Sequence, residues 1–425
     1  MFSEPWGLSV VSLIESRLES PRMKEGRYKI APRTMEKTTI AKSFFVPGYI
    51  PQFDGLRGAA ILLVLIGHSG FLEALPHLGG LQYARFGVDL FFVLSGFLIT
   101  GILLDSKGTE HYFRNFYARR ALRIWPLYYF LLFLVFAVAP LFRPSMRATA
   151  AGIWPAFAFY VQNIALVRHE TYPFALGATW SLAVEEQFYL TWPLLVFLLR
   201  RKTLAIVSVS LVGVSLSLRL AFHFLGAASG FVHFFTLSRL DAIAFGTLAA
   251  LWLRSPNCTL SRWRAVAYQF LGLGLAGIVA ARMLMHRNSS SVGYTFLAIA
   301  FTGLLGLALT SDGRIDLLGR VLSSGWLRYI GKISYGIYLL HYPIFVLWAR
   351  FLQTETFCQT DVARNLLAFA GQMALAIVVA AISWRLFEQP ILRLKERFPS
   401  GSRMHWPEAE ESKSWNRAVV TDSRV

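Results

Sequence analysis

The sequence predicts an all-α polytopic membrane protein, and three observations lead to that fold class. Of the 425 residues, 55% are apolar and only 16% are charged, whereas soluble domains contain about a quarter charged residues. Apolar runs long enough to cross a bilayer as helices recur along the chain. Lys and Arg gather between these runs, as they do in the loops of membrane proteins.

Charge and spacing divide the chain into three parts. Residues 1–49 are expected to form a basic cytoplasmic extension, because the first 45 residues contain eight Lys or Arg and no long apolar core. The same composition predicts that there is no cleavable signal peptide. Residues 50–396 are expected to form the membrane domain, and residues 397–425 a polar cytoplasmic tail.

Ten apolar segments are candidate spans, and they lie near residues 55–72, 86–104, 123–142, 180–199, 204–224, 233–253, 264–282, 293–311, 329–350 and 364–386. A further stretch, 151–167 ("AGIWPAFAFYVQNIALV"), is short and is interrupted by Pro155, Gln162 and Asn163. If it crossed the membrane, the basic triplet 200–202 would lie outside, against the usual cytoplasmic bias. We therefore expect about ten transmembrane helices, both termini in the cytoplasm, and a re-entrant or interfacial segment at 151–167.

The net charge of +18 does not by itself indicate a nucleic-acid partner. Basic residues on the cytoplasmic side set the topology of membrane proteins, and ten spans place most Lys and Arg there. No nucleic acid is therefore expected as a partner. Cys258 and Cys358 fall on opposite sides of the membrane, so no disulfide is expected, and no spacing typical of a metal site occurs.

The first span, within "QFDGLRGAAILLVLIGHSGFL", contains titratable residues that a lipid-facing helix would avoid. A charged side chain at the bilayer centre costs about 2.5–3.5 kcal/mol even on the mildest scale. Asp54, Arg57 and His68 share one helical face, since eleven residues bring Arg57 and His68 to within about 20° of each other. We expect this face to point into the helix bundle.

Depth along the predicted spans sorts the polar residues into two levels. The outer level contains His68, Glu185, Glu186, Arg239, Asp241 and His341. The inner level contains Asp54, Arg57, Arg119, Arg120, Arg123 and Glu388. Structural interpretations remain open: an interfacial Asp54–Arg57 pair, a buried salt bridge at Glu185 and Arg239, hydrogen-bonded histidines, and arginines that only set topology. The convergence of titratable groups at one depth favours a functional site.

Seven sequence blocks, in order, resemble the acyltransferase-3 family of integral membrane acyltransferases. Members of this family include O-acetyltransferases of bacterial O-antigen, exopolysaccharide, Nod factor and macrolides. The similar region runs from about Ile50 to Leu394, and its blocks are "IPQFDGLRGAAILLVLIGHSG", "FGVDLFFVLSGFLIT", "FYARRALRIWPLYY", "TWSLAVEEQFYLTWPLL", "RLDAIAFGTLAA", "IGKISYGIYLLHYPI" and "FEQP".

The resemblance implies an acyl-CoA donor, acetyl-CoA above all, and a hydroxyl acceptor on a cell-envelope carbohydrate or lipid-linked glycan. It also implies a location in the bacterial inner membrane, no bound cofactor and no metal. The catalytic residues would be His68, Glu185, Glu186 and Arg239. The donor-binding residues would be Arg57, Arg119, Arg120 and Arg123. The supporting residues would be Asp54, Asp89, Trp180, Ser181, Asp241 and His341.

The sequence departs from the family pattern in two places. Family members often have His or another polar residue before the Trp-Ser pair, where this chain has Thr179. Some members also have a C-terminal hydrolase-like domain, whereas about thirty polar residues follow the last predicted span here. The membrane domain is therefore expected to acylate the acceptor itself.

In the expected mechanism, the inner arginines bind CoA phosphates and the thiol arm runs along the first helix from Arg57 to His68. His68 acts either as general base or as a transient acyl carrier. Glu185 or Glu186 orients the imidazole, and Arg239 stabilises negative charge or holds that carboxylate. Two other classes stay open: a proton-coupled transporter, which would need no CoA site, and a structural scaffold, which would tolerate His68→Ala.

Overall fold

The structure, a computed structural model, describes residues 50–69, 86–143, 147–168, 174–226, 229–285, 290–311, 316–351 and 362–399. Every regular element in these ranges is a helix, which confirms the all-α prediction for the described part of the chain. The predicted extension 1–49, Cys358 and the tail from residue 400 onward lie outside the described residues.

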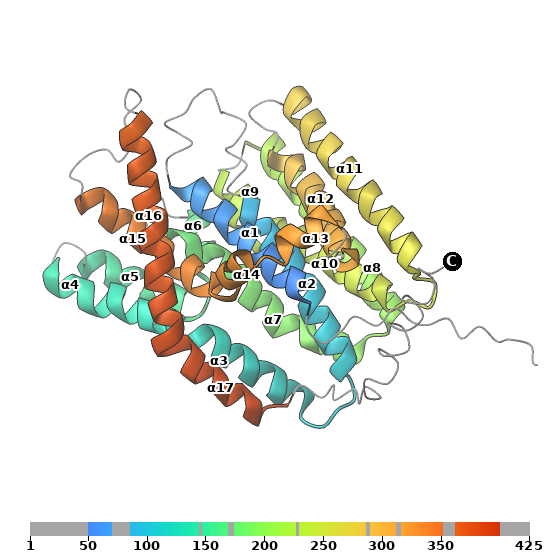
Figure 1. The fold of residues 1–425 in the computed structure, drawn as a ribbon, viewed down its shortest axis with the longest axis horizontal. Coiled ribbons are helices and arrows are strands. Elements are labelled where there is room, and N and C mark those ends of the chain that lie inside the picture. Colours follow the sequence, from blue (N-terminus) through green and yellow to red (C-terminus); the bar gives the residue numbers. More distant parts are fainter. Residues whose placement is uncertain are drawn as a thin grey trace, which may run out of the picture. The chain divides into compact units, whose positions relative to one another are not determined.

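Ten helices of fourteen or more residues make up most of the bundle in Figure 1. They are α1 (Pro51–His68), α2 (Gly87–Ser106), α3 (Tyr112–Phe133), α7 (Trp180–Leu198), α8 (Arg201–Phe224), α10 (Leu240–Leu253), α11 (Leu260–Met285), α12 (Ser290–Thr310), α15 (Ser334–Phe351) and α16 (Val362–Ser383). Shorter helices and single turns join them: η4 (Leu134–Val138), α4 (Ala139–Phe142), α5 (Arg147–Ala158), α6 (Gln162–Arg168), η6 (Phe174–Thr179), α9 (Ser229–Phe234), η7 (Thr236–Ser238), α13 (Leu317–Leu322), α14 (Gly325–Lys332), η9 (Trp384–Glu388), α17 (Gln389–Arg393) and η10 (Leu394–Arg397).

Six helical segments of the described residues are long and apolar enough to cross a membrane. The number rises to seven if α14 and α15, which are bent by 71° relative to each other, count together as one span. The multi-pass prediction is confirmed in this coarser form, but the count of ten is not. Helix α10 is short, with fourteen residues. Helices α1 and α7 have the length, but their polar residues lower the mean hydropathy.

The stretch 151–167 does not form one continuous helix. It divides between α5 and α6, and the chain turns at Tyr160, whose φ of 55° is left-handed. The polar residues that interrupt the stretch are buried anchors: the Gln162 amide donates to the carbonyl of Thr179 at 2.9 Å, and the Asn163 amide donates to the Thr236 hydroxyl at 2.8 Å. These bonds tie α6 to the segments before α7 and α10.

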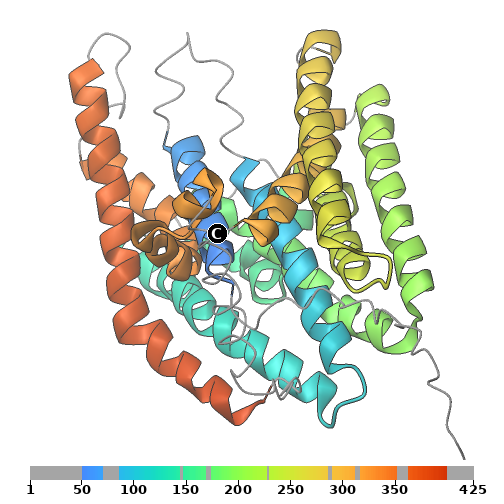
Figure 2. The same cartoon turned by 45° about the vertical axis from the view of Figure 1, so that its right-hand side comes forward.

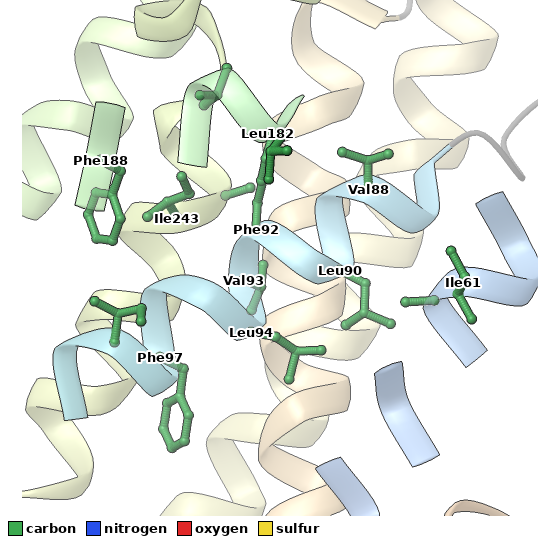
Figure 3. Packing of buried hydrophobic residues seen from close by; sticks show 14 of the residues in the cluster. Ile61, Val88, Leu90, Phe92, Val93, Leu94, Phe97, Leu182, Phe188 and Ile243 are labelled. Carbon is green, nitrogen blue, oxygen red and sulfur yellow. The ribbon is translucent and has the colours of Figure 1, made fainter. Parts of the chain in front are cut away.

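Helix α2 lies at the centre of the hydrophobic core and packs against α1, α7, α10 and α12. Figure 3 shows Leu90 of α2 directed toward Ile61 of α1, whereas Phe92 is directed toward Leu182 of α7. All four of these side chains are buried. Residues on opposite sides of α2 therefore hold together helices that are far apart in the sequence.

Helices α2 and α10 approach each other most closely where both have a glycine. A Cβ atom on Gly96 would clash with the carbonyl oxygen of Ile243, and one on Gly246 would clash with the carbonyl of Val93. Small residues at helix contacts allow backbones to come together, which is a common way for helices to associate within membranes. This contact holds Asp89, in the first turn of α2, close to Arg239, which directly precedes α10.

Candidate functional site

A cavity of about 200 Å³ runs beside α2 and is lined by residues of α1, α2, α3, α7 and α15. Along α2 its lining extends from Val88 to Ile102, which corresponds to about 21 Å of helix. Most of the wall is apolar, and the polar lining consists of three arginines, Glu185, three serines and three tyrosines. The cavity is therefore a narrow passage with a small number of polar groups.

Arg57, Arg120 and Arg123 line this cavity together with Glu185 as the acidic lining residue. Arg57 lies 3.9 Å from the Asp54 carboxylate and donates to the Ser334 hydroxyl at 3.2 Å. Arg120 and Arg123 form no hydrogen bond or ion pair within the described part of the chain. The arginines therefore carry more positive charge than Glu185 neutralises, and a guanidinium is well suited to bind phosphate.

Glu185 belongs to the arginine-lined cavity. Its carboxylate accepts a hydrogen bond from the Ser95 hydroxyl at 2.6 Å, and the Tyr189 hydroxyl donates to Ser95 at 3.1 Å. Glu186, next to it, has a buried oxygen, Oε1, without a hydrogen-bond partner among the described residues. Neither glutamate forms a hydrogen bond or ion pair with His68, so the expected orientation of the His68 imidazole by these carboxylates is not observed.

His68 and His341 form an edge-to-face pair with ring centroids 5.2 Å apart. His68 ends α1, and its Nδ1 lies 2.8 Å from the carbonyl of Val64, which places a proton on Nδ1 and leaves Nε2 as the basic nitrogen. The Nδ1 of His341 lies 2.6 Å from the carbonyl of Tyr338, and its Nε2 is buried without a partner among the described residues. The predicted convergence of the two histidines is confirmed.

Tyr338 connects the cavity with the histidine pair. It lines the cavity, its ring centroid lies 5.8 Å from that of His341, and its hydroxyl donates to the carbonyl of Ala178. The same hydroxyl contacts the Ser181 hydroxyl, which also lines the cavity. Tyr338 was not among the predicted site residues, although a polar side chain three residues before His341 in a predicted span was a signal for it.

Arg239 forms a buried ion pair with Asp89 at 2.7 Å, and the two side chains are only 2% and 3% exposed. The guanidinium lies over the Tyr294 ring at 3.6 Å and over the Trp180 ring at 5.6 Å. Its Nε and Nη1 atoms have no hydrogen-bond partner among the described residues. The expectation that Arg239 holds Glu185 or Glu186 is therefore wrong, because its carboxylate partner is Asp89.

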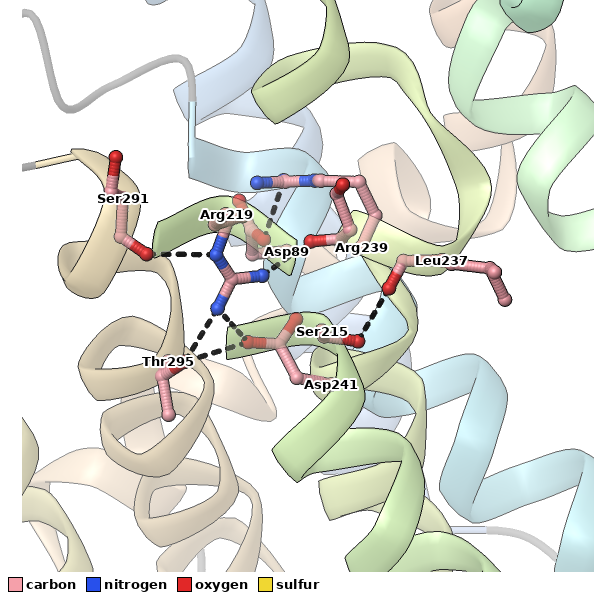
Figure 4. A network of polar contacts seen from close by, with 9 residues as sticks. Asp89, Ser215, Arg219, Leu237, Arg239, Asp241, Ser291 and Thr295 are labelled. Carbon is pink, nitrogen blue, oxygen red and sulfur yellow. Dashed lines mark hydrogen bonds and ion pairs between the residues drawn. The ribbon is translucent and has the colours of Figure 1, made fainter. Parts of the chain in front are cut away.

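Asp241, predicted to lie near Arg239, is held by an arginine that sequence analysis missed. Figure 4 shows Arg219 among Asp241, Thr295 and Ser291; its Nη2 donates to Asp241 at 2.6 Å and its Nε to the carbonyl of Ser291 at 2.8 Å. Arg219 is fully buried. An arginine inside an otherwise apolar span was a sufficient signal, because such residues are rare in membrane helices and need a partner.

Arg119 and Glu388 of the predicted inner level do not line the cavity. Arg119 donates to the carbonyls of Lys395 at 3.2 Å and Phe398 at 2.8 Å, so the structure assigns it to the end of the bundle rather than to the donor cluster. Glu388 is buried and accepts a hydrogen bond from Ser383 at 3.3 Å. Both residues therefore make these contacts within the last described segments of the chain.

The route expected along the first helix is also corrected. Arg57 is the residue of α1 that lines the cavity, and the passage follows α2 instead. The face of α1 between Arg57 and His68 packs into the bundle, where Gly58 lies against α14 and Ala60 and Val64 lie against Gly87 of α2. Helix α1 therefore connects the two levels as a rigid support and does not form the passage itself.

Comparisons with known proteins show the family of this chain. The family model described as an acyltransferase domain matches residues 50–385. The chain is 32% identical to the peptidoglycan O-acetyltransferase OatA of Listeria monocytogenes, over 81% of this chain and 56% of that protein. It is 30% identical to the O-acetyltransferase OatA of Staphylococcus aureus, over 82% of this chain and 58% of that protein.

The chain thus spans a little over half the length of these curated relatives. No solved structure matches the chain significantly. The family match includes both histidines of the pair, all three arginines of the cavity and the Asp89–Arg239 ion pair. The chain therefore belongs to the acyltransferase domain family.

Proposed function

We propose that this protein is a membrane-embedded O-acyltransferase that moves an acyl group, acetyl in the first instance, from acyl-CoA to a hydroxyl of a cell-envelope carbohydrate. Peptidoglycan is the first acceptor to test, because the Listeria relative is named for it. The proposed location is the bacterial inner membrane with both termini in the cytoplasm, where acyl-CoA is available.

The observation that carries the proposal is the cavity that leads from three arginines to the ring contacting the histidine pair. Phosphates of CoA match Arg57, Arg120 and Arg123, because arginine binds phosphate through paired hydrogen bonds. The slender thiol arm of CoA suits a passage of about 200 Å³ that extends about 21 Å along α2. The arm would bring the thioester toward Tyr338 and the histidines.

In the proposed reaction, His68 Nε2 takes the proton of the acceptor hydroxyl. The hydroxyl oxygen attacks the thioester carbonyl carbon, the carbon–sulfur bond breaks, and the CoA thiolate leaves and is protonated. The hydrogen bond from Nδ1 to Val64 holds the ring in the tautomer that this role requires. If His68 instead accepts the acyl group first, Nε2 attacks the thioester carbonyl carbon, the carbon–sulfur bond breaks and the CoA thiolate leaves. The acceptor hydroxyl oxygen then attacks the same carbon and loses its proton, and the carbon–Nε2 bond breaks, which returns His68 to its starting form.

The test uses the full chain, purified and returned to vesicles with labelled acetyl-CoA on one side and a peptidoglycan fragment on the other. His68→Ala is expected to lower transfer by roughly 10²–10⁴-fold, the usual cost of removing a general base. Protein yield and unfolding temperature should stay close to those of the unmodified protein, because His68 is partly exposed at the end of its helix.

His341→Ala serves as the comparison. His341 is fully buried among aromatic rings, so alanine there should lower the amount of folded protein along with the activity. Transfer is measured per unit of folded, membrane-inserted protein for both variants. Normal transfer by the His68 variant would refute the proposed catalytic role of His68. Transfer in the absence of acyl-CoA would show that acyl-CoA is not the donor.

A further inference from the structure

A second cavity, of about 670 Å³, lies between α8, α10, α11 and α12. It shares no lining residue with the cavity beside α2. Figure 2 shows α8 in light green and α11 in yellow as neighbouring helices at one edge of the view. Only 22% of each of these two candidate spans is buried within the described part of the chain, so most of their surface is left uncovered by it.

The inner walls of this cavity are apolar and aromatic. Trp252 and Trp263 stack with ring centroids 4.9 Å apart, and Phe245 and Phe270 line the deeper part. From Phe245 to Arg254 at the mouth, the wall extends along α10 by about 14 Å. A space of this length suits the part of a hydrocarbon chain that lies nearest the lipid headgroup.

The mouth of the cavity is basic. Arg254 is already neutralised by two hydrogen bonds to Asp105, at 2.8 and 2.6 Å, whereas Arg201 and Lys202 also line the cavity and are exposed. Arg201 donates to the carbonyl of Arg254 at 3.1 Å, and Lys202 forms no hydrogen bond or ion pair with a described residue. These two residues begin α8, where the helix dipole disfavours positive charge, so a bound anion would relieve the repulsion.

We propose that this cavity binds one anionic phospholipid of the membrane, with an acyl chain between Phe245 and Trp263 and the phosphate at Arg201 and Lys202. Basic pockets between membrane helices are a known form of recognition for anionic lipid headgroups. The apolar wall supplies the affinity for the chain, and the cation pair selects the headgroup. The bound lipid would hold α8 and α11 together on the face of the bundle away from the histidine pair.

The test measures lipid retained by the purified full chain after exchange in detergent, by native mass spectrometry with phosphatidylglycerol and phosphatidylcholine. The unmodified protein should retain phosphatidylglycerol at least tenfold better than phosphatidylcholine. The double variant Arg201→Gln with Lys202→Gln should lose about thirtyfold in phosphatidylglycerol retention, since each of the two basic residues near anionic lipid contributes about 1 kcal/mol. A control, Arg282→Gln with Arg350→Gln, removes equal charge outside the cavity and should retain the lipid.

A cavity-filling variant, Ala205→Phe, tests the acyl-chain part of the proposal with the charges left in place. It should reduce retention of both lipids. Inorganic phosphate should not compete with phosphatidylglycerol at millimolar concentration, and competition would identify a free-phosphate site instead and overturn the proposal. Equal retention of phosphatidylglycerol by the unmodified protein and the double variant would also overturn it.

Discussion

Asp89→Asn is the substitution whose effect the structure predicts most directly, because Asp89 and Arg239 form an ion pair in the buried core. At 2.7 Å and an effective dielectric constant near 20, their direct attraction is about 6 kcal/mol. Desolvation of both charges offsets much of this, and removing one partner of a buried pair typically costs about 3–5 kcal/mol. Asparagine keeps the shape of Asp89 but leaves the Arg239 charge uncompensated.

The assay is thermal unfolding of the detergent-solubilised protein, with acyl transfer measured in parallel. Because domains are stable by only about 5–15 kcal/mol, a loss of 3–5 kcal/mol should lower both the unfolding temperature and the yield clearly. The double variant Asp89→Asn with Arg239→Gln removes both charges and should recover much of the lost stability.

Acyl transfer separates a structural role of Arg239 from a role in the proposed reaction. Arg239 has two donor atoms, Nε and Nη1, without partners among the described residues. If these atoms stabilise negative charge on the reacting carbonyl, the double variant should be stable yet inactive. An unchanged unfolding temperature for Asp89→Asn would refute the reasoning about the ion pair, and full activity of the double variant would show that Arg239 is only structural.

Three further predictions test the cavity, the helix contact and the described cysteine. Arg120→Ala with Arg123→Ala should raise the KM for acyl-CoA at least tenfold, since each charged contact contributes about 1.5–3 kcal/mol; Arg119→Ala, which changes an arginine outside the cavity, should leave it near the original value. Gly96→Ala should separate α2 from α10 and destabilise the protein by about 1–3 kcal/mol, seen as a lower unfolding temperature. Burial raises the pKa of the Cys258 thiol, so less thiolate is present near neutral pH. Alkylation by iodoacetamide, measured as the increase in intact mass, should therefore be slow at pH 7.5 and accelerate as the pH rises. Fast alkylation at pH 7.5 would contradict this.

The sequence predicted the depth of the polar residues along their helices better than it predicted which helices are neighbours. Helical rise gives the depth of a residue along its span, and this put His68 at the level of His341 and Arg57 at the level of Arg120 and Arg123; the structure brings the members of each set together. Depth does not give the tilt of a helix or the identity of its neighbours, which depend on packing.

The wrong partners follow from that limit. Glu185, at the predicted depth of the histidines, faces the arginines because α7 presents it to the cavity beside Ser95 of α2. Arg239 pairs with Asp89 because the glycine contact brings α2 and α10 together, and no spacing along the chain reveals that contact. The count of ten spans is not confirmed partly because α1 and α7, which the sequence count included, contain polar residues of the site and are therefore less apolar than the six segments that qualify.

The Asp89–Arg239 pair has a consequence for how the protein is made. Its partners are 150 residues apart in the chain, and ribosomes add about 5–20 residues per second. The second helix therefore emerges roughly 8–30 seconds before the arginine that neutralises its aspartate, while a lone aspartate in lipid costs about 2.5–3.5 kcal/mol. During that interval the Asp89 carboxylate lacks the arginine that neutralises it, so the packing of α2 in the bundle is completed only after α10 has been made.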